Sequence, residues 1–131
     1  MIILECMAKA VLAALAVAVL IKLFLLDLII AEGNSMEPAI RSGTALVVNR
    51  LQYGFRFPGQ KGYLVRWAAP NQGEIVVFYT PSGSIAVKRC SGLTENGEFI
   101  AEGDNSLQSY DSRSYGPIPA DNTIGKVLGK K

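Results

Sequence analysis

Apolar residues fill almost all of the first 31 positions of the chain. Charged side chains interrupt this run at only four positions, which are Glu5, Lys9, Lys22 and Asp27. A helix of about 22 residues reaches roughly 33 Å, enough to cross the hydrocarbon core of a bilayer. The pattern therefore predicts an N-terminal membrane anchor helix over residues 1–31. A cleaved secretory signal is the alternative, because the uncharged run 10–21 has the length of a signal peptide's apolar region.

Beyond position 32, short runs rich in β-branched and aromatic residues replace the long apolar stretch. They lie at 45–48, 75–79, 85–90, 98–102 and 123–128, and residues typical of turns separate them. Segments 81–84 and 95–98 have the composition of hairpin connections between neighbouring strands. The pattern predicts a small, mainly β domain over residues 32–131, preceded by one N-terminal transmembrane helix.

The composition removes several kinds of active site. The chain has 131 residues, two cysteines, no histidine and a formal net charge of +2. Without histidine there is no Ser-His-Asp triad, no Cys-His pair and no imidazole-ligated zinc, and two cysteines are too few for a four-thiolate metal site. We expect no metal and no cofactor, and a catalytic base can come only from lysine, aspartate or glutamate.

A basic and aromatic segment spans residues 38–73. It contains no acidic residue, and its charged and aromatic side chains are Arg41, Arg50, Tyr53, Phe55, Arg56, Phe57, Lys61, Tyr63, Arg66 and Trp67. Such a surface suits an interface with anionic lipid. The alternative is a long loop whose aromatic rings pack beneath the sheet. We expect no nucleic acid partner, because the segment adjoins a membrane anchor.

Two residues could form a catalytic pair. Ser35 lies where Gly33 and Pro38 favour a rigid bend, and its own amide could stabilise an oxyanion. Lys88 follows three apolar residues on a predicted strand, where burial could keep its amine neutral and basic. An ordinary polar linker and a solvated strand face are the alternatives for these two positions.

A third candidate is the turn-rich segment 103–113. Its residues Ser109, Asp111 and Arg113 alternate with a period of two, so we expect them to line one face of an extended segment. A hydroxyl there could hold the lysine amine, and the Asp111 carboxylate could pair with Arg113 to brace the loop.

In this order, the three segments resemble the type I signal peptidases, membrane-anchored serine proteases that remove signal peptides with a Ser-Lys dyad. The similarity runs from about residue 32 to the end and rests on four boxes: Ser35-Met36-Glu37-Pro38, Gly73-Glu74-Ile75-Val76-Val77-Phe78, Val87-Lys88-Arg89-Cys90 and Gly103-Asp104-Asn105-Ser106. One departure is Gly33, where some members of the family carry a hydroxyl that completes the oxyanion hole. The chain is also too short after the lysine box for the extra β domain of some members.

The resemblance implies a role for each candidate residue. Ser35 would be the nucleophile, with its amide as one oxyanion donor, and Lys88 would be the general base. Ser109 would supply the hydroxyl that orients the lysine. Asp111 and Arg113 would form a structural ion pair.

The resemblance also implies substrate and location. Met36, Ile40 and Val87 would line a shallow pocket for a small side chain, in keeping with the family's preference for Ala-x-Ala before the cut. The partners would be preproteins that carry signal peptides, together with membrane lipid. A lysine base is typical of bacterial and organellar enzymes, so we expect the bacterial cytoplasmic membrane, with the catalytic domain on its outer face. Ser35, four residues after Ala31, would lie at most about 14 Å along the chain from the anchor.

Three other interpretations remain open. The end of the β domain is similar to peptidases of conjugative transfer systems, which would act on a dedicated substrate. A self-cleaving repressor-type protease has a similar Ser-Met and Val-Lys-Arg spacing, but it would carry a DNA-binding region where this chain has an apolar run. The third is a non-catalytic membrane-tethered module of the same fold.

Overall fold

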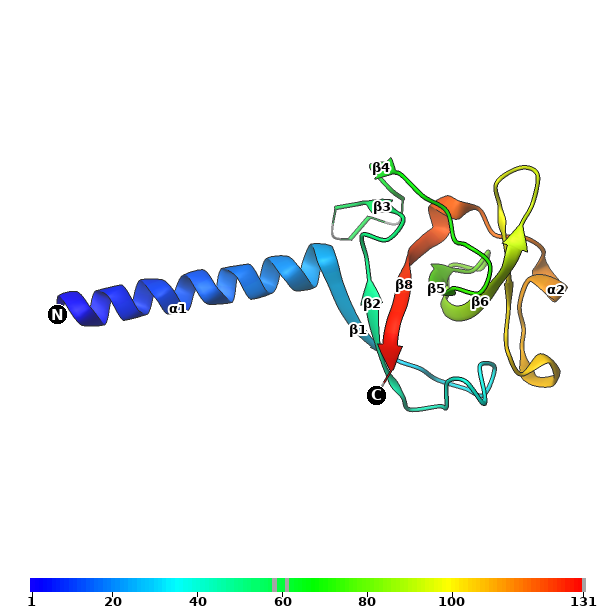
Figure 1. The fold of residues 1–131 in the computed structure, drawn as a ribbon, viewed down its shortest axis with the longest axis horizontal. Coiled ribbons are helices and arrows are strands. Elements are labelled where there is room, and N and C mark those ends of the chain that lie inside the picture. The colour runs from blue at the N-terminus through cyan, green and yellow to red at the C-terminus, as the bar shows by residue number, and fades with distance from the viewer. Residues whose placement is uncertain (58, 61, 131) are drawn as a thin grey trace.

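The computed structural model describes residues 1–57, 59–60 and 62–130. Helix α1 (Ile2–Leu20) projects away from the β domain, and none of its side chains is buried (Figure 1). Within the described residues, it is the one helix with the length and apolar composition needed to cross a membrane. This mainly β fold with an apolar N-terminal helix confirms the predicted fold class.

The helical part of the N-terminus is shorter than predicted. A π-helical turn (Ile21–Leu25) follows α1, and the chain then forms strand β1 (Leu26–Ile30). Side chains alternate along β1, because Asp27 and Ile29 are half-buried whereas their neighbours are exposed. An apolar run does not distinguish such a strand from the end of a membrane helix. The prediction of helix from residue 26 onward is therefore wrong.

Within the described ranges, six antiparallel strands form the main sheet, in the order β1-β2-β8-β5-β6-β7. The strands after β1 are β2 (Ala45–Asn49), β5 (Ile75–Tyr79), β6 (Ile85–Leu93), β7 (Phe99–Glu102) and β8 (Thr123–Lys130). They confirm the predicted strands, and the pairing of β6 with β5 and β7 confirms both hairpins. The small sheet of β3 (Gly54–Phe55) and β4 (Val65–Arg66) has no counterpart in the sequence prediction. Helical turns at Ser106–Gln108, Ser112–Tyr115 (α2) and Ala120–Asn122 lie between β7 and β8.

The core of the β domain contains separate apolar clusters. In one cluster the buried rings of Phe78 and Phe99 meet edge to face, with centroids 5.3 Å apart. A second cluster is built on the buried side chains of Met36, Ile40 and Leu46. Because Met36 follows Ser35 directly, this second cluster anchors the loop that carries the candidate nucleophile.

The basic and aromatic segment is divided between core and surface. Tyr53 and Arg56 are buried, so the packing interpretation holds for this part of the segment. Phe57 and Trp67 are 48% and 56% exposed. Lys61 lies outside the described residues. Lipid contact stays a prediction for the exposed rings.

Candidate active site

Ser35 lies in the loop that connects β1 to β2, and two parts of the chain hold it. The buried side chains of Met36 and Ile40 anchor the loop in the core. From the other side, the Asn105 N–H donates to the Ser35 carbonyl oxygen at 2.8 Å, and Asn105 Nδ2 donates to the Asn34 carbonyl oxygen at 3.0 Å. Contacts from a distant segment therefore set the position of the serine backbone.

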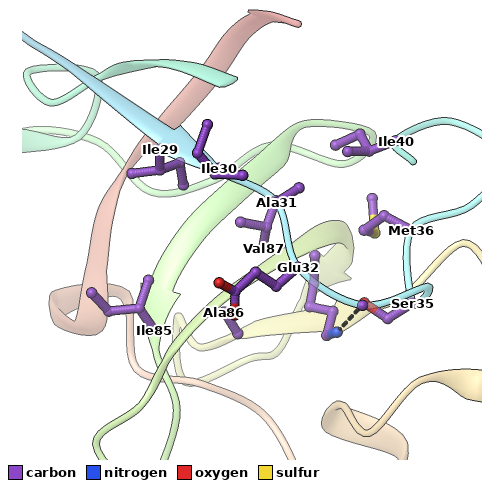
Figure 2. A pocket seen from close by; sticks show the side chains of 12 residues that line it. Ile29, Ile30, Ala31, Glu32, Ser35, Met36, Ile40, Ile85, Ala86 and Val87 are labelled. Carbon is purple, nitrogen blue, oxygen red and sulfur yellow. Dashed lines mark hydrogen bonds between the residues drawn. The ribbon is translucent and has the colours of Figure 1, made fainter. Parts of the chain in front are cut away.

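Lys88 lies on β6, opposite Val76 of β5. Its side chain is 7% exposed, and Nζ donates a hydrogen bond to Ser35 Oγ over 2.7 Å (Figure 2). Burial lowers the pKa of the Lys88 ammonium from its ordinary value; the charge of Asp111 opposes this shift, and that of Arg113 adds to it. The fold thus brings the two candidate catalytic residues into contact and favours a neutral amine.

Asp111 is the centre of the third candidate segment. Its buried carboxylate accepts hydrogen bonds from Arg113 Nη2 at 2.6 Å, from the Gly103 N–H at 2.8 Å and from Ser109 Oγ at 2.5 Å. Burial raises the pKa of this carboxyl, but the hydrogen bonds from Arg113, Ser109 and Gly103 outweigh burial and hold the pKa well below its usual range. The expected ion pair between Asp111 and Arg113 is present.

Two details of this segment differ from the expected geometry. The chain is extended only as far as Asp111, because the Asp111 side chain accepts from the Arg113 N–H at 3.0 Å and caps α2. The predicted extended segment therefore ends before Arg113, and the three side chains do not line one face of it. The Ser109 hydroxyl, which we expect to hold the Lys88 amine, donates to Asp111 in this structure. Its contribution to orienting the lysine stays a prediction.

Gly103, Asp104 and Arg89 also support the site, through contacts that their sequence positions do not indicate. A Cβ atom on Gly103 would lie only 2.6 Å from the Ser35 carbonyl oxygen, so only glycine fits there without movement. Asp104 accepts hydrogen bonds from Nε and Nη2 of Arg89, the residue after Lys88, at 2.9 and 2.8 Å. The density of Gly, Asp and Asn at 103–105 indicates a turn, but it does not indicate which residues the turn contacts.

A cavity of about 390 Å³ lies beside Ser35 and Lys88 (Figure 2). Its walls come from β1 and the residues after it, the serine loop and the first half of β6: Ile29, Ile30, Ala31, Glu32, Gly33, Ser35, Met36, Ile40, Ile85, Ala86, Val87 and Lys88. The candidate pocket residues Met36, Ile40 and Val87 therefore all line this cavity. In the part of the chain that the structure describes, no group of three His, Cys, Asp or Glu side chains could hold a metal ion.

Free strand edges flank this cavity. Among the described residues, β1 pairs with β2 alone, and β6 pairs with β7 only from Arg89 onward. Backbone N–H and C=O groups on the outer edge of β1 and at residues 85–88 of β6 thus remain free to pair with another strand. An extended peptide can add to such edges through its own backbone. The arrangement can hold a peptide strand with one carbonyl close to Ser35 Oγ.

Comparisons with known proteins agree on a family. The family model described as signal peptidase, peptidase S26, matches residues 4–94. The chain is 32% identical over 103 residues to mitochondrial inner membrane protease subunit 1 of Xenopus tropicalis, which covers 71% of this chain and 61% of that protein. It is 26% identical over 125 residues to signal peptidase I of Pseudomonas aeruginosa, with coverages of 92% and 41%. It is 25% identical over 164 aligned positions to signal peptidase I of Bacillus caldolyticus, with coverages of 87% and 84%.

These matches cover only parts of the chain and of its relatives. The chain spans less than two thirds of the Xenopus and Pseudomonas proteins. The family model stops before segment 103–113, which the structure connects to the site through Asn105 and Gly103. The match nevertheless covers more than half of the chain and includes both Ser35 and Lys88. The chain therefore belongs to the signal peptidase family, peptidase S26.

Proposed function

We propose that this chain is a membrane-anchored serine endopeptidase that uses Ser35 and Lys88 to cleave signal peptides from exported preproteins. The observation that carries the proposal is the 2.7 Å contact between Lys88 Nζ and Ser35 Oγ, made by a lysine whose pKa burial lowers. A serine hydroxyl needs a base to become a nucleophile near neutral pH. A lysine is such a base only when a fraction of it is neutral.

Catalysis would proceed in two stages. In the first, Ser35 Oγ attacks the substrate carbonyl carbon while neutral Lys88 takes the hydroxyl proton, and the Ser35 N–H stabilises the oxyanion. The lysine returns this proton to the departing amine, which leaves an acyl-enzyme. In the second stage, Lys88 takes a proton from water, the resulting hydroxide attacks the ester, and the proton returns to Ser35 Oγ as the new carboxyl end leaves.

The cavity suits an extended substrate with small side chains. The free edges of β1 and β6 are available to the substrate backbone on both sides. Side chains alternate along an extended peptide, so the residues one and three positions before the cut would both face Met36, Ile40 and Val87. Met36 and Ile40 are buried and packed in an apolar cluster, so the floor under these two substrate residues would be apolar. This spacing and the apolar floor support cleavage after an Ala-x-Ala sequence.

Lipid is the second proposed partner. Helix α1 has the length of a membrane anchor, and the β domain exposes Phe57, Leu64 and Trp67. Of these, Phe57 lies near the helix end, because Phe24 of the π-helical turn stacks on Phe55 at 5.6 Å, and Phe57 packs edge-on against Phe55 at 5.5 Å. Aromatic rings are typical of the membrane interface. We propose the bacterial cytoplasmic membrane as the location, with the β domain on its outer face.

Cleavage of a preprotein in liposomes tests the proposal. The full chain should remove the signal peptide, and Ser35→Ala or Lys88→Ala should lower kcat/KM by about a thousandfold or more. Lys126→Ala and Ser91→Ala are matched controls that should retain activity, because neither residue lines the cavity. Wild-type rates in Lys88→Ala would refute the dyad. A chain that neither cleaves nor reacts at Ser35 with an acylating probe would be a non-catalytic module.

A further inference from the structure

Glu32 is the one carboxylate among the described residues that line the active-site cavity. Apart from Ser35 and Lys88, the other lining residues are apolar or glycine. The Glu32 side chain is exposed and points across the cavity toward the Ala86 part of β6 (Figure 2). Within the described part of the chain, neither its carboxylate nor its backbone makes a hydrogen bond or ion pair. Its charge is therefore available to a ligand in the groove.

The side of the groove on which Glu32 lies follows from the alternation along β1. Ile29 and Ala31 pack against the apolar cluster beneath the cavity, whereas Ile30 is exposed. Glu32 continues this alternation, so it lies with Ile30 on the outer side of the groove. A substrate side chain that points away from the cavity floor would meet this outer side.

The backbone of the same segment alternates in direction as well. The Ala31 N–H donates to the Thr44 carbonyl oxygen at 2.9 Å, and the Ala31 carbonyl oxygen accepts from the Gly43 N–H at 2.7 Å. The N–H and C=O of the next residue, Glu32, therefore point the other way, toward the groove. A substrate strand that pairs with these groups would pass directly beside the Glu32 carboxylate.

We propose that Glu32 is a specificity-determining residue that favours lysine or arginine two positions before the scissile bond. The inference rests on the proposed peptidase function. In an extended substrate, the residues one and three positions before the cut face the floor, so the residue between them points outward, beside Glu32. Lys88 does not cancel the charge of Glu32, because the lysine must be neutral to act as the base. A glutamate at this substrate position would instead meet a like charge.

Three preprotein substrates that differ only at this position, with lysine, glutamine or glutamate, test the inference on the full chain in zwitterionic detergent micelles. For the wild-type chain, we expect kcat/KM for the lysine substrate to exceed that for the glutamate substrate about fivefold, as an exposed charge pair gives. The glutamine substrate should fall between them. Glu32→Gln should bring the ratio close to one, and Glu32→Lys should invert it. Raising the salt concentration to about 1 M should reduce the wild-type ratio.

Glu95→Gln is the matched control, because Glu95 lies in the turn between β6 and β7 and does not line the cavity. It removes the same charge and should keep the wild-type ratio. If the wild-type chain and Glu32→Gln show the same ratio, the inference is overturned while the peptidase function stands. If the wild-type chain cleaves none of the three substrates, the proposed function is overturned and this inference falls with it.

Discussion

Replacing Gly103 by alanine should inactivate the site without changing Ser35 or Lys88. A Cβ atom at this position would overlap Ser109 Oγ and would lie 2.6 Å from both Ser109 Cβ and the Ser35 carbonyl oxygen. Ordinary van der Waals contact begins at 3.4 Å, so the Ser35 carbonyl oxygen must move about 0.8 Å away from residue 103, and Ser109 must shift within its own segment. A rotation of the Ser109 side chain alone does not relieve the clash, because the contact with Ser35 is with its backbone.

That displacement is large on the scale of catalytic geometry. The same Ser35 carbonyl oxygen accepts the Asn105 N–H at 2.8 Å, so the movement stretches this bond and shifts Ser35 Oγ relative to Lys88 Nζ. A misplacement of about 1 Å lowers rates by roughly a hundredfold, and overpacking costs about 1–3 kcal/mol of stability. We therefore expect kcat/KM of Gly103→Ala to fall by about two orders of magnitude, with a lower Tm.

The assay compares kcat/KM and Tm for this variant and two other glycine variants. Gly92→Ala controls for the added methyl group, because a Cβ atom there meets nothing within 4 Å. Gly125→Ala controls for lost stability, because its Cβ atom would clash with the Asn49 carbonyl oxygen. Neither Gly125 nor Asn49 lines the cavity. It should lower Tm and keep its turnover while folded. Near wild-type turnover in folded Gly103→Ala would refute the positioning argument.

Two further predictions concern the lysine and the membrane. Cleavage should rise with pH through the lowered pKa of Lys88 and fall in acid, because only the neutral amine accepts the Ser35 proton. The free energy of unfolding should also rise with pH between the lowered pKa of Lys88 and 10.5, the pKa of a free lysine, because in this range the unfolded chain binds more protons than the folded chain. Urea titrations of Lys88→Met should lose this rise. Trp67, the one tryptophan of the sequence, should lose fluorescence when the full chain is placed in liposomes of brominated lipid, and unchanged fluorescence would contradict lipid contact.

The sequence predicts the parts of the fold and site whose causes are local. Strands such as β5 and β6 are short apolar runs between turn residues, and Lys88 follows apolar residues on its own strand. Strand β1 is different, because its apolar residues also fit the end of a helix, and only pairing with β2 decides. The contact of Gly103 with Ser35 joins distant parts of the chain, and no local pattern contains it. The hydrogen bond from Ser109 to Asp111 depends likewise on where the chain turns into α2.

The junction between the helix and the sheet adds a length requirement to the proposed preference for small side chains. The chain passes from Leu25 into β1 without a loop, and the Arg50 N–H holds the Leu25 carbonyl oxygen at 2.8 Å. Ser35 is thus ten residues from the helix end, rather than four, and β1 accounts for five of them. With α1 in a bilayer, this stiff connection fixes the height of Ser35 above the lipid. In the proposed peptidase function, a substrate would have to span that height between its own apolar helix and its cleavage site, so the distance between the two would limit which substrates are cleaved.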